Sequence, residues 1–213
     1  MYTKHKWESD VHYNFGYVKY LPKDFDESKK YPLVFFLHGA GERGDDLDVA
    51  MRHGYMKYVR EEGREYPFIF VAPQCPFDKY WGCYTESLLA FLDFICDTLP
   101  VDKDRIYLTG LSMGGTGTWM LSMASPDKFA AIAPICGSGI YWNADCIKHL
   151  PIYIFHGDCD DIVPISESIN MLTSINKRGG NAKMKICHSV GHNSWNCAYG
   201  EDELLNWLLQ QHK

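Results

Sequence analysis

The chain has 213 residues, enough for one domain of generous size with a substantial core, and we expect a single domain over residues 1–213. Its 21 Lys and Arg against 27 Asp and Glu give a net charge of -6, which argues against nucleic acid or an anionic membrane surface as a partner. The hydrophobic fraction of 46% and the charged fraction of 23% are those of an ordinary globular protein, so disordered and fibrous classes are excluded.

The strand candidates come in chain order after an aromatic and β-branched segment, 11–20, which predicts an early strand or hairpin arm. Residues 31–37 (YPLVFFL) form a continuous apolar run that stops at a His-Gly pair, a pattern typical of a strand buried on both faces. Similar short runs, each bounded by turn residues, follow at 67–72, 105–109, 129–134, 151–155 and 182–187.

Helical segments are predicted between these strands, at 84–99, 113–123, 165–177 and 201–211. Alternating strands and helices predict an α/β fold, with a mostly parallel sheet and helices on both faces. No insertion is long enough for a separate lid. Ligands of such sheets bind beyond the carboxyl ends of the strands, so chemistry is expected there.

The uncharged segment 106–126 is long enough to be mistaken for a membrane span. Its four glycines and several Ser and Thr indicate instead a tight turn followed by a packed helix. No apolar segment typical of a signal peptide follows the N-terminus, so we expect a cytoplasmic protein with its eight Cys reduced.

A candidate nucleophile lies where the strand 105–109 runs into Gly110-Leu111-Ser112-Met113-Gly114. This is G-x-S-x-G in a strand–turn–helix setting, and a side chain at Gly110 or Gly114 would collide with neighbouring backbone. The pattern predicts Ser112 as the nucleophile. The alternative is a serine that only caps the helix.

A candidate acid follows the strand 151–155, where Asp158, Asp160 and Asp161 stand close together. A carboxylate is needed to orient an imidazole and to stabilise the imidazolium formed during proton transfer. The residues alone leave the choice among the three open. A calcium loop is excluded because Ile162 stands where a ligand oxygen is required, so no metal is expected.

The candidate base is His192, on a loop just past the last predicted strand, and His188 beside it is the alternative. His38 and His156 each precede a glycine at a strand end, and for them a structural role is expected.

An oxyanion formed at the nucleophile needs two backbone N–H donors. We expect one from Met113, directly after Ser112, and the other from Ala40 in the glycine-containing turn 38–41.

These residues occur in segments that resemble the single-domain α/β-hydrolase esterases, a group of carboxylesterases, feruloyl-esterase-like and polyhydroxybutyrate-depolymerase-like esterases. The matching segments are LHGAGERGDD (37–46), APQCP (72–76), TGLSMGGTGTW (109–119), PDKFAAIAPICG (126–137), IFHGDCDDIVP (154–164) and GHNSW (191–195). The resemblance implies an α/β-hydrolase fold without a cap domain. The family pattern H-G-D-x-D-x-x-V-P implies Asp160 as the acid and Asp158 as a loop-stabilising residue.

The resemblance also implies a serine hydrolase that cleaves carboxylic esters through an acyl-enzyme, with no cofactor. The expected substrate is a small-molecule or carbohydrate-linked ester with a short or aromatic acyl group. Gln74, Trp81, Tyr141 and Trp195 are implied to line its pocket, and Arg43 either anchors a polar substrate or pairs with Glu42.

Three other functions stay open at this point. They are a lysophospholipase or acyl-protein thioesterase, a serine peptidase, and a non-catalytic binding protein on the same fold. The sequence gives no indication of the oligomeric state.

Overall fold

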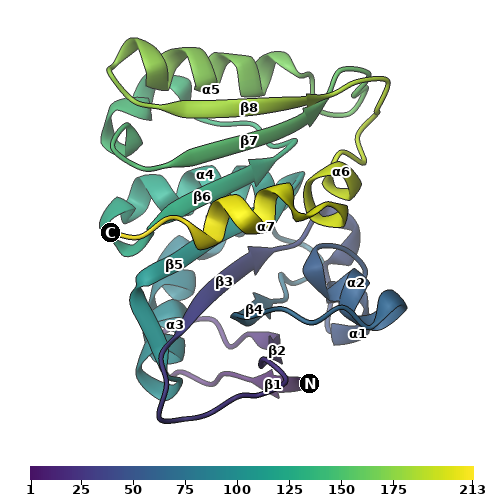
Figure 1. The fold of residues 1–213 in the computed structure, drawn as a ribbon, viewed down its shortest axis with the longest axis vertical. Coiled ribbons are helices and arrows are strands. Elements are labelled where there is room, and N and C mark those ends of the chain that lie inside the picture. The colour runs from purple at the N-terminus through teal and green to yellow at the C-terminus, as the bar shows by residue number, and fades with distance from the viewer.

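A single eight-stranded sheet runs through the molecule with helices on both faces (Figure 1), and the computed structural model describes all 213 residues. The strand order is β1-β2-β4-β3-β5-β6-β7-β8. The strands are β1 (Tyr2–Lys6), β2 (Gly16–Tyr20), β3 (Tyr31–Leu37), β4 (Ile69–Pro73), β5 (Val101–Leu111), β6 (Ala131–Ile135), β7 (Ile152–Gly157) and β8 (Ala182–Cys187). The pairs β1·β2 and β2·β4 are antiparallel and all others are parallel, which confirms the predicted mostly parallel sheet.

The helices divide between the two faces of the sheet. The α-helices are α1 (Leu47–Ala50), α2 (Tyr55–Glu62), α3 (Thr85–Thr98), α4 (Met113–Ala124), α5 (Ser166–Lys177), α6 (Trp195–Gly200) and α7 (Asp202–Leu209), and the 3₁₀ helices are η1 (Ala40–Glu42), η2 (Trp81–Tyr84), η3 (Pro126–Lys128) and η4 (Tyr141–Ile147). Apolar side chains of α3, α4 and α5 join the core cluster on one face, and those of α2, α6 and α7 join the cluster on the other. No helix combines the length and the apolar character needed to traverse a bilayer.

The central strand β3 explains why the sheet needs cover on both sides. Every residue from Pro32 to Leu37 is buried, so both faces of this strand are apolar. Burial of apolar surface contributes about 25 cal/mol per Å², which makes two helical layers the stable arrangement. The uncharged segment 106–126 forms the end of β5 and the helix α4, as its composition predicts.

The N-terminal part departs from the predicted elements. The segment 11–20 is a strand only in its second half, because Ser9 Oγ accepts hydrogen bonds from the N–H groups of Val11 and His12 and forms a turn there. The strand β1 was not predicted, since its side chains are mostly exposed and show no apolar alternation. The helices α1, α2 and α6 were not predicted either, being only four to eight residues long.

Backbone packs directly against backbone where β3, β5 and α4 meet. A Cβ atom at Gly110 would lie 2.5 Å from the carbonyl oxygens of both Leu37 and Gly114, and one at Gly114 would overlap the Leu37 carbonyl. The glycines of the G-x-S-x-G segment therefore allow the end of β5 and the start of α4 to approach β3. This close approach fixes the position of the turn between them.

We predict that Gly114→Ala destabilises the protein by about 3 kcal/mol or more, because the added methyl group has no space beside the Leu37 carbonyl. Chemical denaturation of both proteins measures the difference. Gly41→Ala is the matched control, since a Cβ at Gly41 meets no atom within 4 Å, and its stability is expected to stay within about 1 kcal/mol of the parent. Equal stability of the two variants would contradict the close-packing argument.

Candidate active site

Ser112 occupies the sharp turn between β5 and α4. Its φ of 54° and ψ of −116° are unusual for a residue with a side chain. The Ser112 N–H donates to the Ile135 carbonyl at 2.9 Å, and the Thr116 N–H donates to the Ser112 carbonyl at 3.0 Å. The end of β6 and the first turn of α4 thus hold the strained turn, which presents the Ser112 hydroxyl at the carboxyl edge of the sheet.

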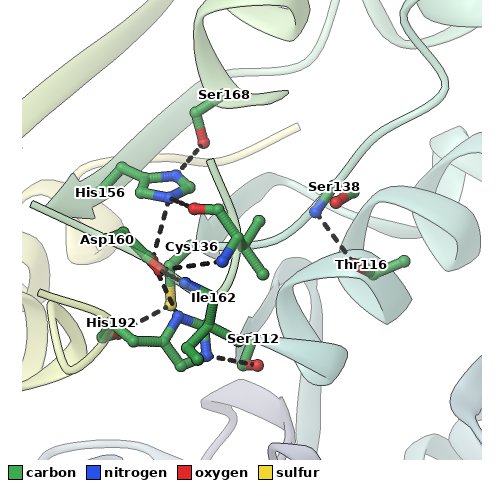
Figure 2. A network of polar contacts seen from close by, with 10 residues as sticks. Ser112, Thr116, Cys136, Ser138, His156, Asp160, Ile162, Ser168 and His192 are labelled. Atoms are coloured by element: carbon green, nitrogen blue, oxygen red, sulfur yellow. Dashed lines mark hydrogen bonds and ion pairs between the residues drawn. The ribbon is translucent and has the colours of Figure 1, made fainter. Parts of the chain in front are cut away.

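Three side chains from separate strand ends form one hydrogen-bonded chain (Figure 2). His192 Nε2 lies 2.8 Å from Ser112 Oγ, and His192 Nδ1 lies 2.8 Å from Asp160 Oδ2. The residues follow β5, β7 and β8. With a neutral imidazole, Nδ1–H donates to the carboxylate and Nε2 accepts from the hydroxyl, the arrangement that lets a serine lose its proton as it attacks.

The Asp160 side chain is completely buried, yet it is held as a carboxylate. Its Oδ1 accepts the N–H groups of Ile162 and Val163, each at 2.9 Å. Burial tends to raise the pKa of the Asp160 carboxyl, but the hydrogen bonds from His192, Val163 and Ile162 outweigh it and place the pKa below its usual value. An ionised Asp160 can stabilise a positive charge on His192.

Asp158 links the loop that carries Asp160 to the loop that carries His192. Its Oδ1 accepts the Ser189 N–H at 2.7 Å, and its Oδ2 lies 3.0 Å from His188 Nδ1. The hydrogen bond from His188 contributes most to lowering the pKa of the Asp158 carboxyl. The Cys159 N–H also donates to the Val190 carbonyl at 3.0 Å. This geometry favours the loop-stabilising role expected for Asp158.

The two rival residues for acid and base are not in the chain of hydrogen bonds. The His188 side chain is 81% exposed and faces Asp158 rather than Ser112. Asp161 is exposed at the surface. Of the three aspartates and two histidines, the structure brings only Asp160 and His192 to Ser112.

Ala40 and Met113 are the first residues of η1 and α4. The first N–H groups of a helix have no partner inside it, so both are free to face an anion. The turn with Ala40 lies against the turn with Ser112. The close packing is evident because an added Cβ at Gly39 would contact Leu111 and one at Gly114 would contact the His38 carbonyl. The assignment of these two donors to an oxyanion hole stays a prediction.

Two of the four residues expected in the substrate pocket are buried instead. Trp81 is 1% exposed and its Nε1–H donates to the His38 carbonyl at 2.9 Å. Gln74 is 3% exposed and its Nε2 donates to the carbonyls of Glu42 and Asp46, both at 2.9 Å. Neither side chain is exposed to a substrate. Both donate hydrogen bonds to carbonyls of the segment around Ala40.

The other two residues of that set remain accessible. Tyr141 is 46% exposed on η4. Trp195 lies against His192 in an edge-to-face arrangement, with ring centroids 5.4 Å apart and planes at 87°. Trp195 therefore stands next to the candidate base, where it can contact a substrate and also restrict the imidazole.

Arg43 forms no ion pair with Glu42. Its Nε donates to the Ala40 carbonyl at 2.9 Å and its Nη1 to the Lys79 carbonyl at 3.2 Å, so the ion-pair expectation is wrong. His38 is structural, as expected. It accepts the Cys75 N–H at Nε2 and donates from Nδ1 to the Gly39 carbonyl, and burial lowers its pKa to about 4.

Cys136 is a neighbour of the site that the sequence did not indicate. It has a φ of 40°, is buried, and its thiol donates to the His192 carbonyl at 3.4 Å. Ligand-type atoms of Cys136, Asp160 and His192 lie within 4.8 Å of one another. A metal ion there would have to displace the hydrogen bond between His192 and Asp160, so the geometry favours proton transfer over metal binding.

The chain is similar to known proteins in both sequence and structure. The model of the phospholipase/carboxylesterase family matches residues 85–200, more than half of the chain. The chain is 31% identical over 172 residues to "Probable feruloyl esterase C" of Aspergillus terreus, and 29% identical over 172 residues to "Feruloyl esterase C" of Emericella nidulans. Each match covers 77% of this chain and 62% of the relative, so the chain spans about three-fifths of their length. A solved structure of a thermostable esterase matches with a TM-score of 0.88 and 33% identity, covering 100% of this chain and 63% of that one.

We predict that a fluorophosphonate labels Ser112, and that Asp160→Asn slows the labelling by about three to four orders of magnitude. The reason is that an amide cannot stabilise the imidazolium and favours the wrong tautomer of His192. The rate of labelling, followed by mass spectrometry, measures the effect. Asp158→Asn is the matched control and should cost less than about ten-fold, because Asn can still accept the Ser189 N–H. If Asp158→Asn lost more labelling rate than Asp160→Asn, the acid would be Asp158 and our assignment of Asp160 would be wrong.

Proposed function

The chain belongs to the phospholipase/carboxylesterase family, and on this premise we propose that it is a serine hydrolase that cleaves carboxylic esters through an acyl-enzyme. The observation that carries the proposal is the unbroken chain from Ser112 Oγ through His192 to Asp160, with 2.8 Å at each step. These contacts supply a nucleophile, a base and a charge partner, which are the groups that acyl transfer requires.

The proposed reaction has two half-reactions. Ser112 Oγ attacks the ester carbon while its proton moves to His192 Nε2, and Asp160 stabilises the imidazolium. The N–H groups of Ala40 and Met113 hold the oxyanion. The tetrahedral intermediate collapses, the carbon–oxygen bond to the alcohol breaks, and His192 gives its proton to the departing alcohol. Water then repeats the sequence on the acyl-enzyme and releases the acid.

No cofactor enters these steps, because the serine, the imidazole and the carboxylate carry every proton and electron pair. The nucleophile is regenerated when water releases the acyl group. The reaction consumes one ester and one water and gives one acid and one alcohol.

The proposed substrate is an ester with an aromatic or short acyl group, free or linked to a carbohydrate. Two relatives are named feruloyl esterases. Exposed aromatic side chains also gather on the loops after the carboxyl ends of β4 and β6. They are Phe77, Tyr80, Tyr141 and Trp142. Flat aromatic faces suit a cinnamoyl-type ring or a sugar ring, by stacking as well as by buried area.

We predict that Ser112→Ala lowers kcat/KM for p-nitrophenyl butyrate by roughly 10⁵- to 10⁶-fold, because the members of a triad act as a unit. Initial rates of the purified wild type and variant measure the effect. Circular dichroism serves as the folding control. A variant that is folded and retains its activity would exclude the acyl-enzyme mechanism.

We also predict that kcat/KM for butyrate or ferulate esters exceeds that for palmitate esters by at least about ten-fold. A long acyl chain gains its affinity by burying methylenes, each worth about 0.8 kcal/mol, and the exposed aromatic groups on the loops after β4 and β6 provide flat faces rather than a trough. In Trp142→Ala, kcat/KM for a ferulate ester should fall by about three- to ten-fold, while kcat/KM for an acetate ester is unchanged. A preference for palmitate would favour the lysophospholipase or thioesterase alternative.

A further inference from the structure

The carboxylate of Asp160 receives a contact that the reaction above does not use. His156, the penultimate residue of β7, is 0% exposed, and its Nε2 lies 3.2 Å from Asp160 Oδ2. This is the same oxygen that accepts the His192 proton at 2.8 Å. Figure 2 shows the two imidazoles on opposite sides of Asp160. The Ile162 and Val163 N–H groups donate to the other oxygen, so the carboxylate has three hydrogen-bond donors and the His156 imidazole as a fourth polar neighbour at 3.2 Å.

The surroundings of His156 define where its proton lies. Nε2 faces two groups that can only accept, the Val163 carbonyl at 2.9 Å and the Asp160 carboxylate, so Nε2 must carry a hydrogen. On the opposite side of the ring, Nδ1 lies 2.7 Å from the hydroxyl of Ser168, a residue of α5 that is 1% exposed. A neutral His156 therefore accepts the Ser168 hydroxyl proton at Nδ1 and donates its Nε2–H to the Val163 carbonyl, with Asp160 Oδ2 close to the same nitrogen.

We propose that His156 is a positioning residue for the triad, whose Nε2–H attracts Asp160 Oδ2 in competition with His192, and that Ser168 holds the His156 ring in the orientation that makes this possible. The proposal rests on the proposed function for its consequence in catalysis. A continuous series of polar contacts then joins five side chains, from Ser168 of α5 through His156, Asp160 and His192 to Ser112. Neither His156 nor Ser168 touches the reacting atoms.

The competition for Oδ2 has a consequence for the base. An N–H dipole close to a carboxylate stabilises its negative charge, so the His156 contact weakens the attraction between Asp160 and a protonated His192. Without that contact, Asp160 would hold the imidazolium more strongly and His192 would be protonated at higher pH. The titratable groups that face Asp160 are His156 of β7, His192 of the loop after β8, and the Cys136 thiol at the end of β6.

Three variants separate this role from simple packing. His156→Leu removes the donor, whereas His156→Gln keeps an N–H near the position of Nε2. Ser168→Ala removes only the hydroxyl that is hydrogen-bonded to His156 Nδ1. The matched control is Ser122→Ala, since Ser122 is buried on α4 and its hydroxyl donates to the Trp119 carbonyl without contacting the triad.

Two measurements on these proteins test the proposal. The first is the pH profile of kcat/KM on p-nitrophenyl butyrate, whose acid limb reports protonation of the base in the free enzyme. The second is the low-field ¹H resonance of the proton between His192 and Asp160, which can be observed without substrate. In His156→Leu we expect the acid limb of the kcat/KM profile to move to higher pH by up to about one unit and the ¹H resonance to move downfield. The maximum value of kcat/KM should fall roughly ten-fold.

The shifts of the limb and the resonance in the other variants should be smaller than in His156→Leu. His156→Gln should stay near the wild type in limb and resonance, Ser168→Ala should show a smaller shift in the direction of His156→Leu, and Ser122→Ala should show none. If His156→Leu does not fold, Ser168→Ala against Ser122→Ala decides the question by the same two measurements.

An unmoved limb and resonance in both His156→Leu and Ser168→Ala would overturn the proposal and leave His156 a packing residue. Equal shifts in His156→Leu and His156→Gln would overturn it as well, because the donor would then be irrelevant. A wild type that hydrolyses no ester but whose resonance moves in His156→Leu would contradict the proposed function alone.

Discussion

The close approach of three backbones at Leu37, Gly110 and Gly114 is the constraint on which the rest of the molecule depends. It forces the chain to leave β5 and enter α4 within one residue, and that residue, Ser112, takes a conformation that an isolated peptide would avoid. The same contact places the turn with Ala40 beside Ser112. Two apolar cores, one on each face of the sheet, supply the stability that holds this arrangement.

The second organising feature is a buried carboxylate that has no contact with water. A lone charge in such a position would be neutralised by protonation, and Asp160 avoids this because it has four N–H neighbours, three of which donate hydrogen bonds to it. Two of them come from its own loop, one from β7 and one from the loop after β8. Separate parts of the chain thus stabilise the Asp160 charge. In return, their contacts with Asp160 fix the positions of these parts relative to one another.

Local pattern predicted much of the fold and the composition of the site. The strands β3 and β8 have the predicted bounds because each is a short run closed by turn residues, and the order of Ser112, Asp160 and His192 along the chain agrees with the order of the strand ends that carry them. The pattern did not reveal which way a loop side chain points. Trp81 and Gln74 were expected at the surface of the site, but carbonyls of the loop above them turn both inward. The contact of His156 with Asp160 was invisible for the same reason, since it depends on how the loop after β7 folds back.

The order of the strands along the chain has a consequence for how the protein is made. Ser112, Asp160 and His192 follow β5, β7 and β8, so the candidate nucleophile leaves the ribosome some 80 residues before the candidate base, to which it is joined by a hydrogen bond. The helix α6, which follows the His192 loop, is held from the N-terminal half, where Arg64 donates to the Gly200 carbonyl and Tyr58 to the Asn196 carbonyl. A nascent chain therefore carries an exposed serine without its hydrogen-bond partner until nearly the whole sheet is assembled. Chemical reactivity at Ser112 would then report the completion of folding.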